Sequence, residues 1–492
     1  MGVKTSFLPV CIVLFPFIMT FIIYYVEQYS EKMRNALAVG TSVVTFLSVV
    51  ALYPDIIAGK IIEYHLFQLL PNLEISFRVD ILSFSLALLS SFIWMLVSIY
   101  SIDYMCKEHG CNRYYPVFIF ALASCMGIFL AGDLFSLFVF FEAMSLISYV
   151  LVVHEETVDA LKAGYKYLIM TIIGGLALFF GIIITFELAG TVAITGVTLI
   201  KEPSSLAFFA FISFLIGFGM KAGMFPLHVW LPDAHPVAPS PASALLSGIM
   251  LKTGAYGLLR VIFHVYGIDF MRETGWTLIL TVIAVITILL GSAVAITQDD
   301  LKRRLAYSSI GQMGYILLGM SILTERALIG NIFHIFSHAF MKSTLFLCAG
   351  AIILKTGKRS IKELGGIGKQ MPFTMFSFTL AALAMIGIPP FNGFLSKWTL
   401  ALGAMDAGMP FYVLVLLLSS LMNGIYYLPI IIAAFFGSEH DDSLVEINEA
   451  PYKMLIPIAI LAVSCLLFGL LPTNLPFDLS RVAADFLLKG GH

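Results

Sequence analysis

The sequence predicts an all-α polytopic membrane protein with about fourteen transmembrane helices, and three observations indicate this fold class. Of 492 residues, 60% are hydrophobic and only 12% are charged, with a mean hydropathy of +0.97. A soluble domain carries roughly 25% charged residues, so a soluble chain of this length could not cover its surface with so few. The apolar residues also gather in runs of about 17–25, long enough to span a bilayer. Finally, two runs are interrupted by glycine and proline beside a lysine, which is typical of transporters.

Each apolar run is expected to form one span. The predicted spans cover about 5–26, 35–57, 79–101, 115–131, 134–153, 165–188, 206–230, 240–263, 276–297, 303–323, 328–354, 374–404, 411–436 and 453–471. No small-residue cleavage site follows the first run, so we interpret it as a helix and not as a removed signal. The mixed segment 58–78 predicts a small extracellular hairpin, and the tail after 472 predicts a surface helix.

Basic residues predict the orientation, because cytoplasmic loops carry an excess of lysine and arginine. The loops 298–304 and 355–370 are strongly basic and fall on the same side of the membrane. Further basic residues on that side are Lys32, Arg34, Lys107, Arg113 and Lys162. The sequence therefore predicts a multi-pass protein of the cell (plasma) membrane, with these loops in the cytoplasm and both termini outside. The acidic loop 438–450 also falls inside, which the rule tolerates because acidic residues count little.

The two interrupted spans are expected to be broken helices. The seventh contains Gly223 and Pro226 close to Lys221, and the twelfth contains the run GIPPFNG close to Lys397. Proline removes a backbone donor and kinks a helix, although an isolated kink could be incidental. Paired breaks in two halves of a chain are typical of transporters built from inverted repeats.

Five ionisable residues lie well inside the predicted spans. They are Glu142, Lys221, Lys252, Lys342 and Lys397. Each costs about 2.5–3.5 kcal/mol at the centre of a spanning helix, so we expect them to face the bundle interior, pair with one another and contact water. A lysine near a helix end could instead extend its amine to the headgroups. That alternative suits Lys162 or Lys166. It suits Lys221, Lys252 and Lys342 poorly, because each of these three has apolar turns on both sides.

Glu142 is the only acid in its span, and Lys221 on the seventh span is its candidate partner. A pair of this kind that opens and closes would switch the lysine between a state that binds a proton and a state that releases it. That alternation is what a proton carrier needs.

His334, His338 and Lys342 are spaced by four residues and therefore stack on one helix face. Histidine titrates near neutral pH and transfers a proton through either ring nitrogen, so the spacing favours a relay. A zinc pair is the alternative, but position 335 holds Ile335 where the metalloprotease pattern needs glutamate. One of the two histidines could also be a hydrogen-bonded core residue.

Residues near the end of the seventh span could admit ions from the cytoplasm. These are His228, Asp233 and His235. A polar cluster that satisfies backbone groups at a helix end explains them equally well. Cys106 and Cys111 flank His109, but neither spacing nor ligand count matches a metal or disulfide pattern. We therefore expect no metal, no cofactor and no catalytic residue in this chain.

Three long motifs carry a family resemblance. They are GMKAGMFPLHVWLPDAHPVAPSPASALLSGIMLKTGAYGLLR, QDDLKRRLAYSSIGQMGYI and HIFSHAFMKSTLFLCAG. Over about 75–470 the chain resembles the antiporter-like subunits shared by respiratory complex I, Mrp-type Na⁺/H⁺ antiporters and energy-converting membrane-bound hydrogenases. The resemblance implies two inverted five-helix repeats with broken helices 7 and 12. The implied parts are 1–114 (helices 1–3), 115–264 (first repeat), 265–437 (second repeat) and 438–492 (helix 14 and tail).

The resemblance also implies residue roles. Glu142 and Lys221 match the modulating pair, Lys252 matches a bridging lysine, His334 and His338 match a central relay, and Lys397 matches the exit to the outside. The longest members carry a lateral helix after span 14. This chain ends too soon for one, so it resembles the shorter members.

The predicted function is translocation of protons, or exchange of Na⁺ for H⁺, as a subunit of a redox-driven or Mrp-type complex. The predicted partners are other membrane subunits, protons or Na⁺, and lipid, without nucleic acid. One alternative is a stand-alone secondary transporter of a small solute, although the ionisable residues form a line and not a pocket. Another is an intramembrane enzyme, for which the sequence offers no ligand set.

Overall fold

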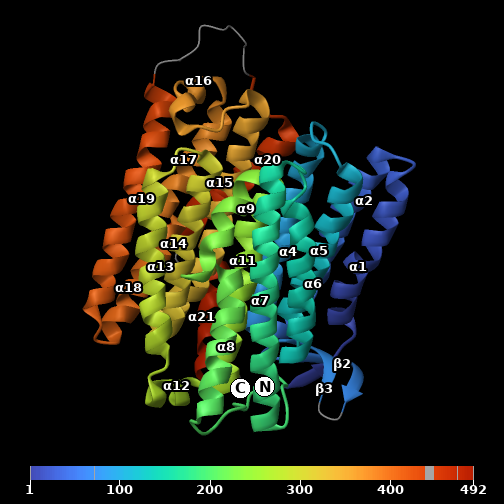
Figure 1. The fold of residues 1–492 in the computed structure, drawn as a ribbon, viewed down its shortest axis with the longest axis vertical. Helices are drawn as coiled ribbons and strands as arrows, with labels where there is room; N and C mark the ends of the chain where they lie inside the picture. The colour runs from blue at the N-terminus through green and yellow to red at the C-terminus, as the bar shows by residue number, and fades with distance from the viewer. Residues whose placement is uncertain (1, 71–72, 438–447, 472, 474, 491–492) are drawn as a thin grey trace.

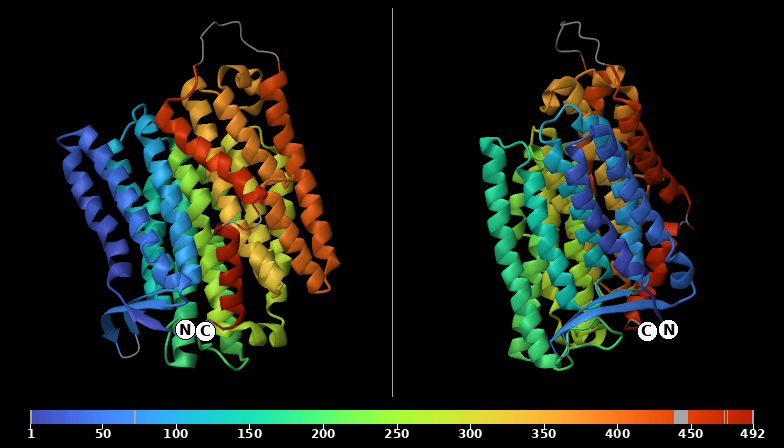
Figure 2. Two further views of the ribbon diagram at one scale, coloured as in Figure 1. Left: turned by 180° about the vertical axis from the view of Figure 1, so that it is seen from behind. Right: turned by 90° about the vertical axis from the view of Figure 1, so that its right-hand side faces the viewer.

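The structure is a computed structural model that describes residues 2–70, 73–437, 448–471, 473 and 475–490. It is a bundle of long helices with a small β-sheet at one end (Figures 1 and 2). Within the described residues, twelve helices are long and apolar enough to cross a membrane. The mostly helical membrane class is confirmed, with the sheet as an addition. The count of fourteen spans and the inverted repeats stay predictions.

The N-terminal part holds four helices and the whole sheet. Its helices are α1 (Leu8–Glu27), α2 (Glu31–Val50), α3 (Tyr53–Ile57) and α4 (Ile81–Met105). The strands are β1 (Val3–Thr5), β2 (Ile61–Leu70) and β3 (Leu73–Val79). β2 pairs with β3 in antiparallel fashion, and β1 adds in parallel to the other edge of β2. The predicted hairpin at 58–78 is thus confirmed, whereas no sequence pattern predicted β1.

The middle of the chain alternates between the two ends of the bundle. The elements are α5 (Cys111–Leu130), α6 (Leu134–Val152), α7 (Val158–Ala189), α8 (Ser205–Ala222), η1 (Leu227–Trp230), α9 (Leu231–Val237), α10 (Ser240–Leu245), η2 (Leu246–Met250), α11 (Leu251–Arg260), η3 (Val261–Tyr266) and α12 (Ile268–Thr274). The stretch from α10 to η3 forms one continuous, fully buried crossing. It occupies the centre of the bundle because helices surround it on all sides.

The remaining helices complete the bundle. They are α13 (Thr277–Thr297), α14 (Leu301–Ser321), α15 (Glu325–Thr356), η4 (Ile361–Leu364), α16 (Ile367–Gln370), α17 (Pro372–Ile386), α18 (Asn392–Asp406), α19 (Pro410–Phe436), α20 (Tyr452–Leu470) and α21 (Leu475–Leu488). Most of the acidic loop predicted at 438–450 lies outside the described residues.

Both predicted helix breaks are present. α8 ends at Ala222 and the chain resumes as η1 and α9, while α17 ends at Ile386 and α18 begins only at Asn392. α17 and α18 approach each other so closely that a Cβ on Gly393 would overlap the Ala384 carbonyl. Glycine is therefore required where the chain re-enters the bundle after the second break.

The tail forms a helix, α21, as predicted, and it lies on the outside of the bundle (Figure 2). Leu479, Ala483 and Phe486 on one of its faces are buried, where it packs against α15 and α4. Arg481 is exposed on the opposite face. The helix is amphipathic, so its apolar face is buried in the bundle while its charged face stays outside.

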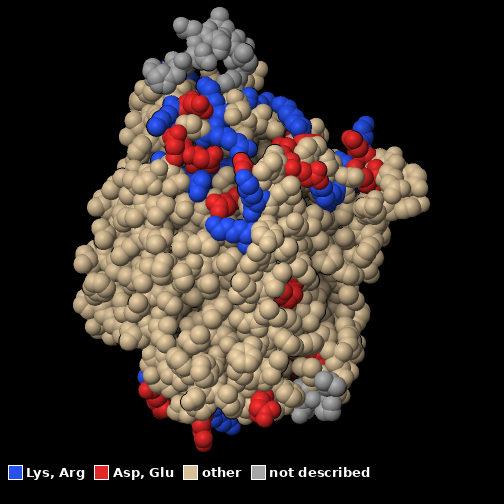
Figure 3. Space-filling model, viewed as in Figure 1, with Lys and Arg blue, Asp and Glu red and all other residues tan. Residues whose placement is uncertain are grey.

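Charged side chains mark the two ends of the molecule. Figure 3 shows most of them gathered at the top and bottom, with a broad, almost entirely uncharged belt between that exposes an acidic side chain to the right of centre. We call the end with the loops 106–110, 153–157, 298–300 and 357–366 the basic end, and the end with β1–β3 and α12 the sheet end. At the sheet end, the buried Arg260 guanidinium binds both carboxylate oxygens of Asp80 at 2.7 and 2.8 Å. This ion pair fixes the start of α4 to the end of α11.

Candidate site: a buried line of lysines and histidines

The four predicted central lysines all lie inside the protein. Lys221 and Lys342 are 0% exposed, Lys252 is 1% exposed and Lys397 is 7% exposed. Their amines therefore do not extend to headgroups. None of the four forms an ion pair with a carboxylate of the described residues. Their charged forms are stabilised by hydrogen bonds and dipoles, which is a costly arrangement in a membrane protein.

Lys221 and Glu142 are neighbours without being in contact. They interact electrostatically, but no ion pair joins them. Lys221 Nζ instead donates a 2.8 Å hydrogen bond to the Tyr167 hydroxyl, which donates to the Ser145 carbonyl at 2.9 Å. The half-buried Glu142 has an oxygen, Oε1, with no hydrogen-bond partner. The predicted closed pair is thus found open, with Tyr167 as the partner of the lysine.

A glycine provides the space for the Glu142 carboxylate. A Cβ added to Gly175 of α7 would overlap both carboxylate oxygens. The neighbouring Gly174 faces the Met220 side chain instead. The missing side chain at position 175 therefore determines where the carboxylate lies.

Lys252 and His338 join the two halves of the chain. Lys252 Nζ lies 2.8 Å from His338 Nδ1 and donates to the Ser247 carbonyl at 2.5 Å. Lys252 belongs to α11 and His338 to α15, so this contact crosses from the first part of the bundle to the second. The sequence predicted both residues, but their contact follows only from the packing of α11 on α15.

The two histidines continue the line along α15. The rings of His334 and His338 are parallel, with centroids 6.1 Å apart and an interplanar angle of 1°. The Nε2 atoms of both rings are buried and have no protein partner, a state that in proteins usually indicates a bound water. On the far side, His334 Nδ1 lies 2.9 Å from Ser396 Oγ. Ser396 precedes Lys397, so the line reaches the second helix break.

Lys397 lies against the end of α17. Its Nζ donates to the carbonyls of Met385 at 2.8 Å and Ile386 at 3.1 Å, and to Ser420 Oγ at 3.1 Å. It also lies 5.0 Å from the centre of the Tyr315 ring. All of these partners are uncharged.

Lys342 lies on a side branch. Its Nζ donates to the Leu305 carbonyl at 2.9 Å and to the Tyr427 hydroxyl at 3.2 Å. Ser309 also donates to Leu305, and its hydroxyl lies 2.7 Å from that of Ser247. Because the Ser247 carbonyl binds Lys252, a short polar connection links Lys342 to the main line.

The three residues predicted near the cytoplasm do not come together. Asp233 lies at the basic end, where it pairs with Lys166 at 2.8 Å and with Arg303 at 3.5 Å. The His228 ring stacks on Phe225, whereas the His235 ring stacks on Phe346. His235 is fully buried, and neither of its ring nitrogens has a partner. His228 is also buried and its Nδ1 has no partner, but only His235 has two unsatisfied ring nitrogens.

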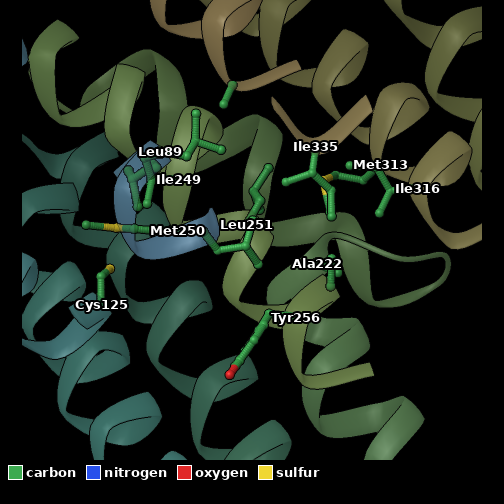
Figure 4. Close-up of a cluster of buried hydrophobic side chains, with 14 of the residues drawn as sticks. Leu89, Cys125, Ala222, Ile249, Met250, Leu251, Tyr256, Met313, Ile316 and Ile335 are labelled. Carbon is green, nitrogen blue, oxygen red and sulfur yellow. The ribbon is translucent and has the colours of Figure 1, made fainter. Parts of the chain in front are cut away.

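Apolar side chains surround the line. Figure 4 shows such a cluster, with Leu89 of α4, Cys125 of α5, Met250 and Leu251 beside Lys252, and Ile335 of α15. Met313 and Ile316 of α14 also belong to it. The aliphatic side chains of this cluster offer a proton no hydrogen-bond partner, whereas the residues of the line do.

No group of three or more His, Cys, Asp or Glu side chains that could hold a metal ion occurs among the described residues. The six cysteines are all free thiols. Cys106 and Cys111 each donate to backbone carbonyls.

Several uncharged residues of the site escaped sequence reasoning. They are Tyr167, Tyr315, Ser396, Ser420 and Tyr427. Serine and tyrosine cost little in a membrane helix and often only pack there, so composition does not single them out. The sequence therefore offered no signal that distinguishes these five residues from packing residues.

Comparison with known proteins identifies the family. Residues 131–423, more than half of the chain, match the family described as NADH:quinone oxidoreductase/Mrp antiporter, TM. Residues 70–115 match the family described as NADH-Ubiquinone oxidoreductase (complex I), chain 5 N-terminus. The chain belongs to the antiporter-like subunit family. As a member of the antiporter-like subunits, it is a multi-pass membrane protein.

Two full-length relatives illustrate the range of the antiporter-like subunits. The chain is 32% identical to the NADH-quinone oxidoreductase subunit N of Desulforudis audaxviator, covering 95% of this chain and 96% of that protein. It is 30% identical to a subunit of the Na(+)/H(+) antiporter of Alkalihalophilus pseudofirmus, covering 97% of this chain and 96% of that protein.

Chains of two solved membrane complexes share the fold. A chain of the archaeal membrane-bound sulfane sulfur reductase superposes with a TM-score of 0.89 at 24% identity, over 98% of both chains. A chain of the Mrp complex from Dietzia sp. DQ12-45-1b superposes with a TM-score of 0.87 at 24% identity, again over 98% of both.

Proposed function

We propose that this chain translocates protons, or exchanges Na⁺ for protons, across the membrane as an antiporter-like subunit of a larger complex. One observation carries the proposal. Lys252, His338, His334, Ser396 and Lys397 form a buried line in which each polar group lies next to the following one. The line has two gaps, one between the histidines, whose buried Nε2 atoms lack a protein partner, and one between the Ser396 hydroxyl and the Lys397 amine, which donate to other groups; we propose that water bridges both.

The chemistry of the line suits proton transfer. His338 shares one ring nitrogen with Lys252 and keeps the other free, and His334 does the same with Ser396. Each ring can therefore accept a proton on one side and release it on the other. His235 lies towards the basic end and its ring nitrogens have no partner, so it is our candidate for the residue that receives the ion from the cytoplasm. Lys397 is our candidate for the residue that releases the ion to the outside.

Lys221 and Glu142 are proposed to act as the switch. In the structure Lys221 donates to Tyr167, while Glu142 keeps an oxygen free. Movement of the amine from the hydroxyl to the carboxylate would strengthen its hold on a proton, because an opposite charge nearby favours the charged form. The alternation between Tyr167 and Glu142 gives the lysine its two states.

We infer that the basic end faces the cytoplasm and that the membrane is the plasma membrane. Lys302, Arg303 and Arg304 at the start of α14 and the basic loop 357–366 lie at that end, and cytoplasmic loops are rich in lysine and arginine. Both termini would then lie outside. The names of the relatives, an NADH-quinone oxidoreductase subunit and an antiporter subunit, support partnership with other membrane subunits in a redox-driven or Mrp-type complex.

The test is proton conduction by the native complex in liposomes that contain a pH dye. A valinomycin-clamped K⁺ gradient supplies the driving potential, so no redox substrate is needed. Lys221→Ala and Glu142→Gln should each lower the initial rate at least about tenfold, because each removes one partner of the switch. Lys162→Ala, which removes an exposed lysine of α7, should leave the rate unchanged. Wild-type rates in Lys221→Ala would show that Lys221 is not a carrier.

A further inference from the structure

The second helix break presents a row of backbone carbonyls to a buried cation. α17 ends at Ile386, and its last carbonyls have no successor in the helix to bind. The Met385 carbonyl accepts from Lys397 Nζ at 2.8 Å and from the Asn423 amide at 3.1 Å. The Ile386 carbonyl accepts from Lys397 at 3.1 Å. Ser420 Oγ adds a third oxygen at 3.1 Å.

These oxygens suit a bare monovalent cation as well as an ammonium. The carbonyl end of a helix carries a partial negative charge that attracts cations. In broken transporter helices, unwound carbonyls and the carbonyl ends of half-helices coordinate Na⁺. No carboxylate pairs with Lys397 among the described residues, so the site neutralises its cation with dipoles alone. Any small cation that replaced the ammonium would meet the same oxygens.

At the first helix break, the lysine does not bind the carbonyls at the helix end. There the Met220 carbonyl accepts from the Trp230 indole at 3.0 Å and from the Gly223 amide. Lys221 precedes that break and donates to the Tyr167 hydroxyl, away from the carbonyls. Lys397 follows its break and reaches back to the carbonyls. The two lysines therefore differ in chemistry although both lie beside a break.

We propose that the end of α17 is a Na⁺ site at which Na⁺ competes with the ammonium of Lys397. When Lys397 gives up its proton towards Ser396 and His334, the neutral amine no longer holds the carbonyls. Na⁺ then binds the carbonyls of Met385 and Ile386 and the hydroxyl of Ser420. One proton leaves as one Na⁺ arrives, so the charge of the site stays at one positive. Its part in transport rests on the proposed function, but binding can be tested alone.

Few titratable groups surround Lys397, so the pH dependence of Na⁺ binding can be assigned to its amine. Tyr315 of α14 faces it with its ring, and His334 of α15 interacts with it electrostatically. α17 presents carbonyls, and α19 presents Ser420 and Asn423. No titratable side chain of α20 contacts it in the described structure. The competing proton is therefore that of Lys397, with His334 as the nearest other base.

The experiment measures equilibrium binding of ²²Na⁺ to the full-length chain in lipid nanodiscs, with choline keeping the ionic strength constant. In the wild-type chain, the apparent Na⁺ affinity should rise about tenfold per pH unit while Lys397 is protonated, since one proton competes with one Na⁺. Lys397→Ala should bind Na⁺ without this pH dependence. Lys397→Arg should bind none, because a guanidinium stays charged. Lys162→Ala should behave as the wild type.

Three results would overturn the site. They are the absence of Na⁺ binding in Lys397→Ala, unchanged binding in Lys397→Arg, and unchanged affinity at high pH in Ser420→Ala, which keeps the lysine and removes one oxygen. Binding without proton movement in the liposome assay, run both without and with a Na⁺ gradient, would refute the proposed function and leave the Na⁺ site standing. Proton movement without Na⁺ binding would refute the site and leave the proposed function standing.

Discussion

Individual charged residues of the site could be predicted, whereas their partners could not. A lysine or glutamate in an apolar span is conspicuous because its cost must be compensated, and this revealed Glu142, Lys221 and Lys397. The sequence predicted that Lys221 pairs with Glu142, yet its amine donates to Tyr167. A tyrosine in a membrane helix carries no such cost, so nothing in the sequence distinguished Tyr167 from packing residues.

Gly175 offers a test of how the position of the carboxylate controls conduction. Gly175→Ala would push the Glu142 side chain away, because a Cβ there overlaps both oxygens. We expect proton conduction in the liposome assay to fall on the order of tenfold, about 1.4 kcal/mol in the barrier. Helix stability should not fall, since alanine has the higher helix propensity.

Gly174→Ala is the matched control. Its Cβ would meet only the Met220 side chain, whose end lies 3.0 Å away and is flexible. Conduction should stay close to that of the wild type. Equal losses in both variants would mean that α7 packing, and not the carboxylate, sets the rate.

At the scale of elements, helix existence was predictable and helix placement was not. Gly223, Pro226 and the run GIPPFNG indicated both breaks correctly, because proline cannot donate a backbone hydrogen bond. The amphipathic tail predicted a helix, but the sequence could not show whether lipid or protein covers its apolar face. In the structure, the apolar face of α21 packs against α15 and α4. The contact between Lys252 and His338 likewise depends on how α11 meets α15.

The Asp80–Arg260 pair is predicted to hold α4 and α11 together. Burial alone would raise the pKa of Asp80, but the Arg260 guanidinium and the Ser83 amide hold that pKa well below its usual range. Asp80→Asn would leave the buried guanidinium without its counter-charge, so we expect a loss of about 3–5 kcal/mol in the free energy of unfolding. Denaturant unfolding of the purified chain in mixed micelles measures this loss.

The control variant removes an exposed ion pair. Arg326 pairs with Asp406 at 3.3 Å on the surface, so Asp406→Asn should cost at most about 1 kcal/mol.

The Asp80–Arg260 pair also predicts a pH dependence. Because the pKa of Asp80 is lower in the folded than in the unfolded protein, the ionised Asp80 contributes its full stability above the unfolded pKa of Asp, roughly 3.9. This contribution is lost as the pH falls towards the folded-state pKa. The contribution of Asp80 should therefore stay constant from about pH 5 to 8. A pH-dependent loss within that window would contradict the pairing.

At the scale of the molecule, the buried line leads from the centre of the bundle to one side. It passes from Lys252 to His338, follows α15 to His334 and ends at Lys397 on α18, which lies at one side of the bundle in Figure 1. Ser420 at that side is partly exposed. The side of the membrane on which ions enter the line depends on which end of the bundle faces the cytoplasm.

The orientation can be measured with cysteine labelling. Cys106 is exposed at the basic end, and Glu273 is exposed in α12 at the sheet end. With Cys11 and Cys111 replaced by serine, a membrane-impermeant maleimide should label Cys106 in everted vesicles but not in intact cells. The reason is that the basic loops are retained in the cytoplasm. Glu273→Cys, made in a background where Cys106 is also serine, should give the opposite pattern.

Because these two positions lie at opposite ends of one bundle, their labelling must be reciprocal whichever way the protein inserts. Labelling of both in intact cells would indicate damaged membranes and calls for repetition with sealed cells. Labelling of Cys106 alone in intact cells would place the basic end outside. The proposed direction, with ions arriving near His235 and leaving near Lys397, would then be reversed, although the line itself would remain.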